Sequence, residues 1–539
     1  MDRRNFGSIA TALLAVLASG AYSKGPGGAP AVFLAPEKLA RIGAIDERFQ
    51  SYNVEMVEVI GGRFWKPYKD IAALLNAQES AAPRGGNNAE AIPAGMDPGL
   101  YQKRSPIDLA NPRLRKLAAA LGPAYVRVSG TWANSTHFHN SDQPPPAAPP
   151  EGFGGVLTRQ QWKGVVEFAQ AVNAKLVTSF ATSPGTRDAS GVWTPIEARQ
   201  LLDYTRTVGG RIAAAEFMNE PTLAAMGGAP KGYDAAAFAR DIAVFRRFAS
   251  QSAPDMIVLG PGGVAEGLRL APIGIAPNML KSEDLLQATG PVFDAFSYHS
   301  YGATSKRCAT VSPALQTTAG AALSEEYLSR AGRIEEFYAG LRDRFEPGKP
   351  LWVTETADAA CGGNPWASTF LDSFRYLDQL GRLAKRGVQV HMHNTLAASD
   401  YGLLDDGTMM PRPNYWAALM WRRLMGTTVL DPGPAPVPSL HLYAHCLRGR
   451  PGGVALLAIN TDREAPQSME LSTAAERYTL TARKLEDTAV QLNGSELRLG
   501  ADDAVPQLAG IAISSGPIAL APASITFLAL PNANNGSCR

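Results

Sequence analysis

This chain of 539 residues has little cysteine, little histidine and almost no excess of either charge. It contains four Cys and seven His, and its 51 basic and 49 acidic residues leave a formal net charge of +2. Such a small charge disfavours nucleic-acid binding, so an acidic ligand would have to be held by a local site. Beyond the N-terminal segment no stretch reaches 18 consecutive apolar residues, so the sequence predicts no membrane span.

Motifs that mark several common enzyme classes are also missing. The glycine-rich run at 260–263 is not followed by the Lys-Ser/Thr pair of a phosphate-binding loop. The sequence has no Gly-x-Ser-x-Gly elbow, which disfavours a serine hydrolase. His391 and His393 fall on one face of a predicted strand, but no further ligand with suitable spacing accompanies them or His299. We therefore predict no metal and no cofactor.

The N-terminal segment predicts export. Residues 1–21 combine two arginines, an apolar run from 9 to 17 and a small-residue cleavage site, which is the layout of a signal peptide. The run Arg-Arg-Asn-Phe at 3–6 also resembles a twin-arginine export motif, and the alternative is an ordinary secretory signal. Either route predicts a periplasmic or extracellular protein.

Four cysteines in an exported chain predict two disulfides. Spacing alone leaves all three pairings open. Cys308 and Cys361 follow predicted strands that lead to the same edge of the fold, whereas Cys446 and Cys538 lie in the C-terminal region. We therefore expect these two pairs, and the alternative is free, buried thiols.

From residue 52 onward, strand-like runs alternate with amphipathic helices, which predicts a parallel sheet wrapped by helices. The predicted strands are 52–59, 124–130, 175–181, 212–218, 256–260, 295–301, 351–356 and 388–394. The predicted helices are 160–174, 195–208, 233–252, 324–345, 368–386 and 415–425. This order predicts an α/β fold, a (β/α)8 catalytic barrel at 50–426, with functional loops at the carboxyl ends of the strands.

The pattern changes after residue 426 to short strands separated by Gly, Pro and Asn turns. This change predicts a smaller C-terminal β-sandwich domain at 427–539. Residues 30–49 precede the first barrel strand, and we expect them to join this second domain.

Two connections within the barrel are long. The connection at 61–105 carries aromatic and basic residues at 64–69, which we expect near the substrate, and a Gly-, Ala- and Asn-rich tip at 81–95, which we expect to be mobile. The proline-rich connection at 140–155 is typical of an extended surface loop without chemistry of its own.

Two glutamates follow apolar, strand-like runs. Glu220 comes after the run at 212–218, and Glu355 lies in the run that begins at 351. A retaining glycosidase needs two carboxyl groups about 5 Å apart, one to protonate the leaving oxygen and one to attack the anomeric carbon. Asn219 can donate to a neighbouring sugar hydroxyl, and Pro221 stiffens the exit of the strand. The alternative for each glutamate is a helix cap or a salt-bridge partner.

Ordered segments of the chain match the pattern of one known family. In the barrel region they are 111–131, 217–221 (Phe-Met-Asn-Glu-Pro), 298–301 (Tyr-His-Ser-Tyr), 354–356, 361–363, 400–404 and 413–416, and in the C-terminal region 442–446, 490–494 and Cys538. Together they resemble glycoside hydrolase family 79, the heparanase and β-glucuronidase family of clan A. The resemblance spans the mature chain from about residue 50 to the end. It implies a (β/α)8 barrel with a disulfide-bridged C-terminal domain.

The resemblance also implies catalytic roles. Glu220 is then the general acid/base, Glu355 is the nucleophile, and Tyr301 holds Glu355 by a hydrogen bond. A phenol donor of this kind keeps a carboxylate ionised and oriented.

Substrate binding is implied as well. The carboxylate of a uronic acid would be bound by Tyr401 and by the backbone N–H groups of Gly362 and Gly363, which hold an anion without a formal positive charge. The residues implied for sugar hydroxyls are Glu55, Thr131 and Asn219. Alternatives are a core aromatic for Tyr401 and a plain turn for the glycines. The longer spacing between Glu355 and Cys361 than in animal members leaves a shift of the glycine pair by one position open.

Two departures from the animal heparanases affect the expected substrate. The long excised insert of those enzymes is replaced here by the proline-rich connection, and Lys163 stands nearly alone where they carry lysine clusters. We therefore expect a single chain that needs no proteolytic activation and binds highly sulfated glycans more weakly.

The sequence predicts a retaining, heparanase-like endo-β-glucuronidase that cleaves glucuronic acid linkages in heparan-sulfate-type glycans through a covalent glycosyl-enzyme. One alternative is an exo-β-glucuronidase that removes terminal glucuronate. Others are a clan A glycosidase for a neutral sugar and a non-catalytic carbohydrate-binding protein, which the presence of both glutamates disfavours. The expected partner is a glucuronic-acid-containing oligosaccharide or polysaccharide, and we expect a monomer.

Overall fold

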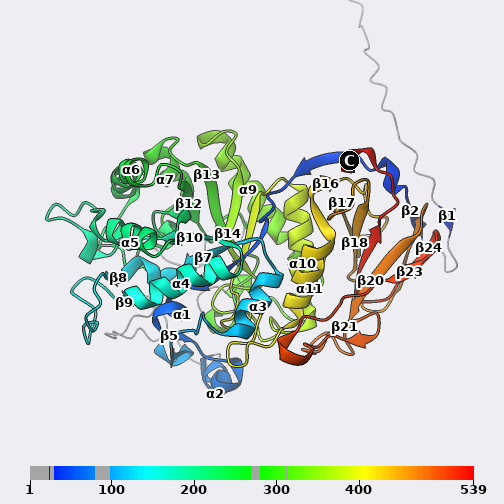
Figure 1. The fold of residues 1–539 in the computed structure, drawn as a ribbon, viewed down its shortest axis with the longest axis horizontal. Coiled ribbons are helices and arrows are strands. Elements are labelled where there is room, and N and C mark those ends of the chain that lie inside the picture. Colours follow the sequence, from blue (N-terminus) through cyan, green and yellow to red (C-terminus); the bar gives the residue numbers. More distant parts are fainter. Residues whose placement is uncertain (1–22, 25–29, 79–96, 269–278, 310–312) are drawn as a thin grey trace, which may run out of the picture.

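The computed structural model describes residues 23–24, 30–78, 97–268, 279–309 and 313–539. The predicted signal peptide at 1–21 and the predicted mobile tip at 81–95 lie outside these residues. The described chain forms a helix-wrapped barrel and a smaller region of β-sheets beside it (Figure 1). None of the described helices is long and apolar enough to cross a membrane.

Eight parallel strands close into a barrel, which confirms the predicted fold class. In chain order they are β4 (Gln50–Glu55), β7 (Ala124–Ser129), β10 (Ala174–Ser179), β11 (Ile212–Glu216), β12 (Ile257–Gly263), β13 (Ala295–Tyr301), β14 (Leu351–Ala357) and β15 (Val390–His393). The barrel closes where β15 and β7 pair with the two sides of β4. All carboxyl ends of these strands therefore meet at one rim.

Several strand predictions were wrong at their ends. For example, β10 ends at Ser179 rather than at 181, and β12 continues to Gly263 rather than ending at 260. The strand expected at 52–59 ends at Glu55, because the Glu58 carboxylate accepts a 2.7 Å bond from the Glu55 N–H and starts helix α1 (Met56–Ile60). The strand expected at 212–218 ends at Glu216. Beyond it the Asn134 side chain pairs with both backbone groups of Asn219, at 2.8 and 2.9 Å, in place of a neighbouring strand.

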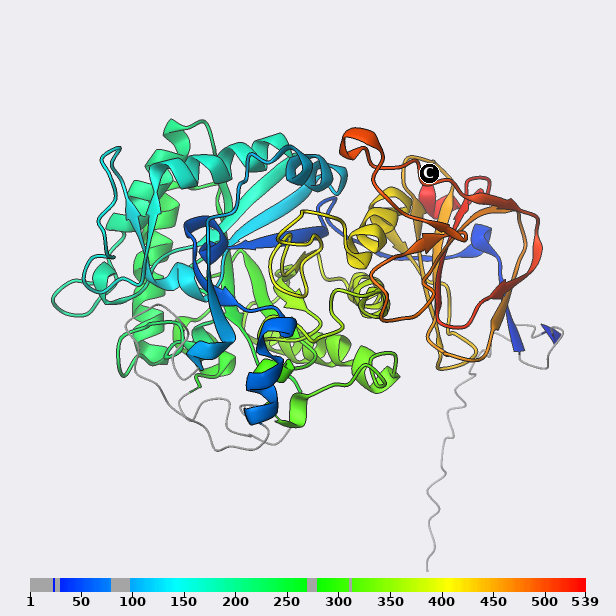
Figure 2. The same cartoon turned by 90° about the horizontal axis from the view of Figure 1, so that it is seen from below.

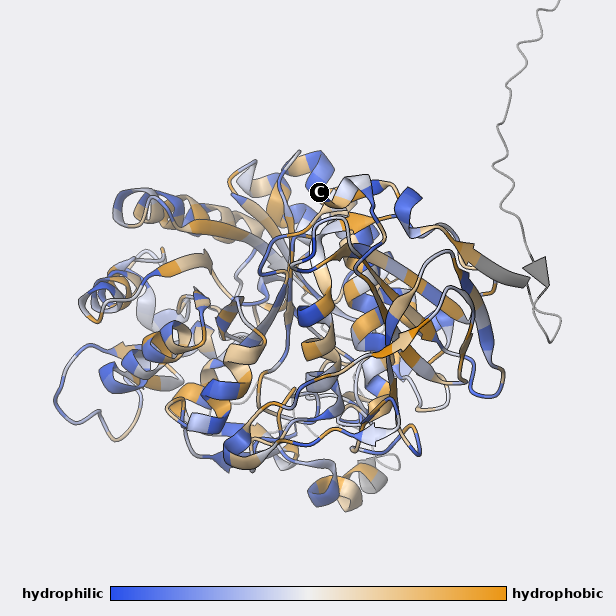
Figure 3. Ribbon diagram, turned by 45° about the vertical axis from the view of Figure 1, so that its right-hand side comes forward, coloured by the Kyte–Doolittle hydropathy of each residue, from blue (hydrophilic) through white to orange (hydrophobic). Residues whose placement is uncertain are grey.

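Helices cover the outside of the barrel. They are α3 (Pro112–Ala120), α4 (Arg159–Ala171), α5 (Ile196–Thr207), α6 (Ala235–Ser252), α7 (Ser282–Thr289), α8 (Glu325–Leu328), α9 (Arg330–Phe345), α10 (Phe370–Lys385) and α11 (Pro413–Leu424). Their ribbons carry both hydrophilic and hydrophobic residues, as expected for helices with one buried face (Figure 3). The predicted helix at 324–345 is divided in two, and α3 and α7 were not among the predicted helices.

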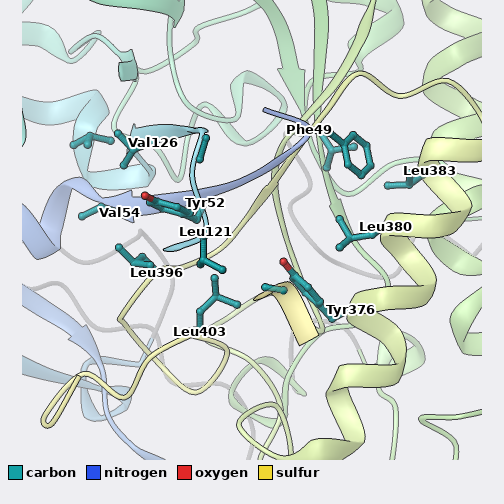
Figure 4. Close-up of a cluster of buried hydrophobic side chains, with 14 of the residues drawn as sticks. Phe49, Tyr52, Val54, Leu121, Val126, Tyr376, Leu380, Leu383, Leu396 and Leu403 are labelled. Carbon is teal, nitrogen blue, oxygen red and sulfur yellow. The ribbon is translucent and has the colours of Figure 1, made fainter. Parts of the chain in front are cut away.

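Helix α10 is buried on almost every side. It lies with α11 between the barrel and the nine-stranded sheet of the C-terminal region (Figure 1). Tyr376, Leu380 and Leu383 of this helix belong to the same buried cluster as Phe49 and Tyr52 beside the first barrel strand (Figure 4). Its polar residues Asp372, Arg375 and Asp378 are therefore buried as well, and Arg375 donates to Asp372.

The C-terminal region is built from two packed sheets. One has the order β1-β2-β19-β24, and the other has the order β22-β21-β20-β25-β18-β17-β16-β3 with β23 paired to β20. The strands are β1 (Ser23–Lys24), β2 (Pro30–Leu34), β3 (Arg41–Ala44), β16 (Met425–Leu430), β17 (Leu440–Leu447), β18 (Val454–Asn460), β19 (Gln467–Leu471), β20 (Ala475–Thr481), β21 (Gln491–Leu492), β22 (Ser495–Glu496), β23 (Ile511–Ile513), β24 (Gly516–Leu520) and β25 (Ser524–Leu530). Apolar side chains from both sheets form one buried cluster.

Strands that precede the barrel join these sheets. Strand β2 pairs with β19 and β3 pairs with β16. Strand β16 continues directly from α11.

The long connection after β4 is partly ordered. It contains β5 (Gly62–Trp65), which pairs with β6 (Tyr101–Arg104), and helix α2 (Tyr68–Gln78), which projects beside the barrel (Figure 2). Because it follows the first strand, it lies at the carboxyl-end rim. The sequence analysis treated this segment as a loop and did not recognise the hairpin.

Both predicted disulfides are present. Cys308 is bonded to Cys361 across the loops that follow β13 and β14. Cys446 in β17 is bonded to Cys538 near the C-terminus. No free cysteine occurs in the described part of the chain.

Candidate active site

Glu220 and Glu355 meet at the carboxyl-end rim of the barrel. Glu355 lies within β14, whereas Glu220 follows β11 and has a left-handed backbone with φ of 48°. One carboxylate oxygen of each glutamate and a ring nitrogen of His299 all lie within 4.8 Å of one another. The structure therefore brings together the two carboxyl groups that the sequence singled out.

A buried ion pair supports this site from inside the barrel. Arg127 of β7 donates to Glu216 at 2.8 Å and to Glu355 at 2.9 Å. Glu216 also accepts hydrogen bonds from Ser297 at 2.8 Å and Thr354 at 2.7 Å, so both of its carboxylate oxygens have donors. Burial would raise the pKa of Glu216, but the charge of Arg127 and these hydrogen bonds hold it below its usual value.

His299 lies between the two rim glutamates. Its Nδ1 is 3.0 Å from Glu220 Oε1 and 3.8 Å from Glu355 Oε2. Burial opposes the charged imidazole, but the negative charge of Glu355 and the bond to Glu220 raise the pKa of His299 overall. Burial and the nearby Glu355 charge raise the pKa of Glu220, as a general acid requires.

The second oxygen of Glu355 is held by a phenol. Tyr301 Oη donates to Glu355 Oε1 at 2.6 Å. Burial and the charge of Glu355 raise the pKa of Tyr301 well above its usual value, so this side chain remains a donor. Glu355 thus receives hydrogen bonds on both oxygens, from Tyr301 and from Arg127.

One amide group connects the polar residues on the other side. Asn394 Nδ2 lies 3.0 Å from Glu55 Oε1 and 3.2 Å from the hydroxyls of both Tyr301 and Tyr401. Burial and the charge of Glu355 raise the pKa of Glu55 well above its usual value. A Cβ on Gly130 would lie 1.6 Å from Glu55 Oε2, so this position has room only for glycine.

The segment that carries the acid is fixed by two asparagines. The Asn134 side chain forms both backbone bonds to Asn219 that replace strand pairing. Arg127 donates to Asn219 Oδ1 at 2.8 Å. This contact leaves the amide nitrogen of Asn219 as its donor toward a ligand.

Arg307 forms hydrogen bonds that connect the loops near Cys361. Its Nη1 lies 3.3, 3.0 and 3.1 Å from the carbonyls of Cys361, Gly362 and Gly363, and Nη2 pairs with Asp400. Because a trans peptide places C=O and N–H on opposite sides, the Gly362 and Gly363 N–H groups point away from this guanidinium. Both glycines have positive φ, at 79° and 84°.

Most of the predicted site residues line a single cavity: Glu55, Thr131, Asn219, Glu220, Tyr301, Glu355 and Tyr401. From the long connection, Phe64, Trp65 and Tyr101 reach the same cavity. Its lining includes Cys361 but neither Gly362 nor Gly363, which lie buried behind it.

Sequence reasoning missed Arg127, Glu216, Asn394 and Arg307. Arg127 and Glu216 could have been noticed as charged residues inside otherwise apolar strands, because such positions are rarely charged without a partner. Nothing comparable marks Asn394 or Arg307.

The histidines weighed as metal ligands lie apart from the two glutamates, except His299. Burial lowers the pKa of His391 to about 3 and that of His393 well below its usual value, so both are neutral. The group of Glu220, His299 and Glu355 has the spacing of a cation site. Arg127, 2.9 Å from Glu355, already supplies positive charge there.

A (β/α)8 barrel with two adjoining carboxyl groups at its functional rim defines this protein as a glycoside hydrolase. Residues 104–381 match the model of the glycosyl hydrolase family 79 N-terminal domain. The chain belongs to glycosyl hydrolase family 79.

Known proteins agree with this assignment. The chain is 27% identical over 495 residues to heparanase-like protein 1 of Arabidopsis thaliana, covering 82% of this chain and 88% of that protein. It is 33% identical over 189 residues to the baicalin-beta-D-glucuronidase of Scutellaria baicalensis, covering 33% and 36%. In fold it is similar to a 4-O-alpha-L-rhamnosyl-beta-D-glucuronidase from Fusarium oxysporum, with a TM-score of 0.59, 13% identity and coverage of 93% and 99%.

Proposed function

We propose that this protein is a retaining β-glucuronidase. The observation that carries the proposal is the approach of the Glu220 and Glu355 carboxylate oxygens to within 4.8 Å. Retaining glycosidases place these groups about 5–5.5 Å apart, whereas inverting ones leave room for a water between them. The glucuronidase named among the relatives supports the sugar.

The site supports a division of labour between the two glutamates. Glu355 attacks the anomeric carbon while the bond to the leaving oxygen breaks, and the proton of Glu220 passes to that oxygen. Glu220 then takes a proton from water, whose oxygen displaces Glu355 from the sugar. The raised pKa of Glu220 suits the first step, and the two donors on Glu355 hold its carboxylate in place.

Sugar recognition is proposed for the remaining cavity residues. Glu55, Thr131 and Asn219 bind hydroxyl groups, and Tyr401 binds the uronate carboxylate. For the backbone anion site, the position of Cys361 at the cavity supports the shifted pair, in which the N–H groups of Cys361 and Gly362 approach the carboxylate, over Gly362 and Gly363.

Endo cleavage of heparan-sulfate-type chains remains a prediction, and removal of a terminal glucuronate is the alternative. One observation favours the alternative, because among the described residues no Lys or Arg lines the cavity. A sulfated chain would need such partners.

Three further expectations stand as proposals. We propose a barrel domain at 50–426, a sandwich domain from 30–49 and 427–539, and a monomer. The two disulfides support export to the periplasm or the cell exterior.

Trapping of the intermediate tests the proposal. A 2-deoxy-2-fluoro-β-glucuronyl fluoride should inactivate the enzyme, lose its anomeric fluoride and add the mass of one 2-deoxy-2-fluoroglucuronyl group to the peptide that contains Glu355. With azide, Glu220→Ala should form a β-glucuronyl azide, which retention requires. Labelling of another residue, or an unlabelled enzyme that still releases glucuronate, would overturn the assignment. Sizing of products from a heparan sulfate oligosaccharide separates internal from terminal cleavage.

A further inference from the structure

The two sides of the cavity differ in chemistry. One part of the cavity is polar and holds Glu55 of β4, Tyr301 at the end of β13, and Asn394 and Tyr401 after β15, which are joined through the Asn394 amide. The part formed by the segments that follow β11, β12 and β13 carries, beside Asn219, Glu220 and Thr304, the apolar residues Leu223, Met226, Val264, Ala265, Ala303 and Leu315. A sugar with several hydroxyls fits the first side, and the second side offers it few partners.

The apolar side adjoins the proposed acid. Glu220 immediately precedes the short 3-10 helix Pro221–Leu223, and the Met226 N–H bonds to the Leu223 carbonyl at 2.9 Å. Thr222 Oγ1 accepts a 3.0 Å bond from the Val264 N–H, which fixes this turn against the end of β12. Because Glu220 protonates the leaving oxygen, these side chains lie where the leaving group must be.

Packing of the hydrophobic core does not account for Leu223, Met226 and Leu315. Among the described residues, the half-buried apolar side chains that pack against the main core cluster do not include Leu223, Met226 or Leu315. All three are only partly buried. They line the cavity without contributing to the packing that stabilises the barrel.

The charges that line the cavity also disfavour binding of a sulfated ligand. The described cavity lining contains no Lys or Arg, and its ionisable side chains include the carboxyl groups of Glu55, Glu220 and Glu355. A sulfate placed here would leave water without a cation to pair with, which is unfavourable.

We propose that the Leu223–Met226–Val264 side of the cavity is an aglycone subsite for an uncharged, flat apolar group such as an aromatic ring. The inference rests on the proposed β-glucuronidase function and names the class of its leaving group. The aromatic residues Phe64, Trp65 and Trp132 line the same cavity, and a cavity with apolar and aromatic lining is typical of sites for such ligands.

Two naphthyl substrates test the charge of the leaving group. The enzyme is given 2-naphthyl β-D-glucuronide and its 6-sulfonated analogue. The sulfonate makes naphthol the better leaving group, so chemistry alone favours the charged substrate. We expect instead at least a tenfold higher kcat/KM for the uncharged one. Equal values, or faster cleavage of the sulfonated substrate, would overturn the proposal.

Variants test the location. Leu223→Asn and Met226→Gln should each lower kcat/KM for 2-naphthyl glucuronide about tenfold more than for β-glucuronyl fluoride, which carries no aglycone. Ile196→Gln, at a surface position that is 61% exposed and outside the cavity, is the matched control and should change neither. Equal losses on both substrates would show that the residues support the catalytic centre rather than an aglycone. If the wild-type enzyme did not hydrolyse even β-glucuronyl fluoride, the proposed glucuronidase function itself would be rejected.

Discussion

His299 Nδ1 lies 3.0 Å from Glu220 Oε1, and the same nitrogen is 3.8 Å from Glu355 Oε2. One buried imidazole therefore lies close to both carboxyl groups. Its hydrogen bond and its charge lower the pKa of Glu220, while burial and Glu355 raise it. The pKa of the proposed general acid, Glu220, therefore depends on His299.

We predict that His299→Phe moves the alkaline limb of the kcat/KM profile to higher pH. The general acid works only when protonated, so activity is lost as pH rises through the pKa of Glu220. Removing the imidazole removes an influence that lowers this pKa. We also expect about a 10²-fold lower kcat, because Glu220 loses its orienting contact. His139→Phe, at the proline-rich connection, is the control, and an unchanged limb would contradict the prediction.

Substitution of Gly130 tests whether activity depends on the position of the Glu55 carboxylate. A Cβ at this position would lie 1.6 Å from Glu55 Oε2, so Gly130→Ala must displace the carboxylate. We expect kcat/KM on a glucuronide to fall by about 10²-fold. Gly191→Ala is the matched control, since Gly191 also has positive φ, at 78°, but a Cβ there meets nothing within 4 Å. Equal losses in both variants would mean that backbone strain, not Glu55, is responsible.

Glu216→Gln should destabilise the barrel. It leaves the Arg127 guanidinium, which is 1% exposed, without its closest carboxylate. Loss of one partner of a buried ion pair typically costs about 3–5 kcal/mol. Urea denaturation measures the free energy of unfolding, and the exposed pair of Arg344 and Glu283 provides the control, where Glu283→Gln should cost less than about 1 kcal/mol. Similar changes in both variants would contradict this account.

Stability should fall between about pH 4.5 and pH 7 because of Glu58. Burial raises the pKa of its carboxyl to about 7 from 4.5. The folded protein therefore binds this proton more tightly than the unfolded chain, and stability is lost as pH rises through this window. The full effect is about 3 kcal/mol. Glu58→Gln, which keeps an acceptor for the Glu55 N–H, should be more stable than wild type at pH 8 and similar at pH 4. A constant difference across this range would refute the prediction.

The two disulfides should differ in what they support. Replacing Cys446 and Cys538 with Ser opens a loop of 92 residues and should lower stability by up to about 4 kcal/mol without changing KM. Replacing Cys308 and Cys361 should also raise KM, because both residues line the cavity. Thermal melts and steady-state kinetics on both variants make the comparison. A changed KM in the first variant alone would reverse the assignment.

Much of the site could be predicted because it depends on short runs of sequence. The alternation of apolar strands and helices is a local pattern, and parallel strands in a closed barrel must bring their carboxyl ends together. The positions of Glu220 and Glu355 after such runs therefore indicated a shared rim.

The sequence by itself determined the barrel and the two glutamates, because each depends on residue types within short runs of the chain. The cysteine pairing spans 53 and 92 residues, and spacing alone left it open. Only the tertiary structure decided what surrounds these residues. Arg127, Asn394 and Arg307 act through partners 7 to 339 residues away in the chain, and no local pattern encodes such contacts. The unlike sides of the cavity have the same origin. Each side is assembled from several loops, and their chemistry becomes one surface only when the barrel closes.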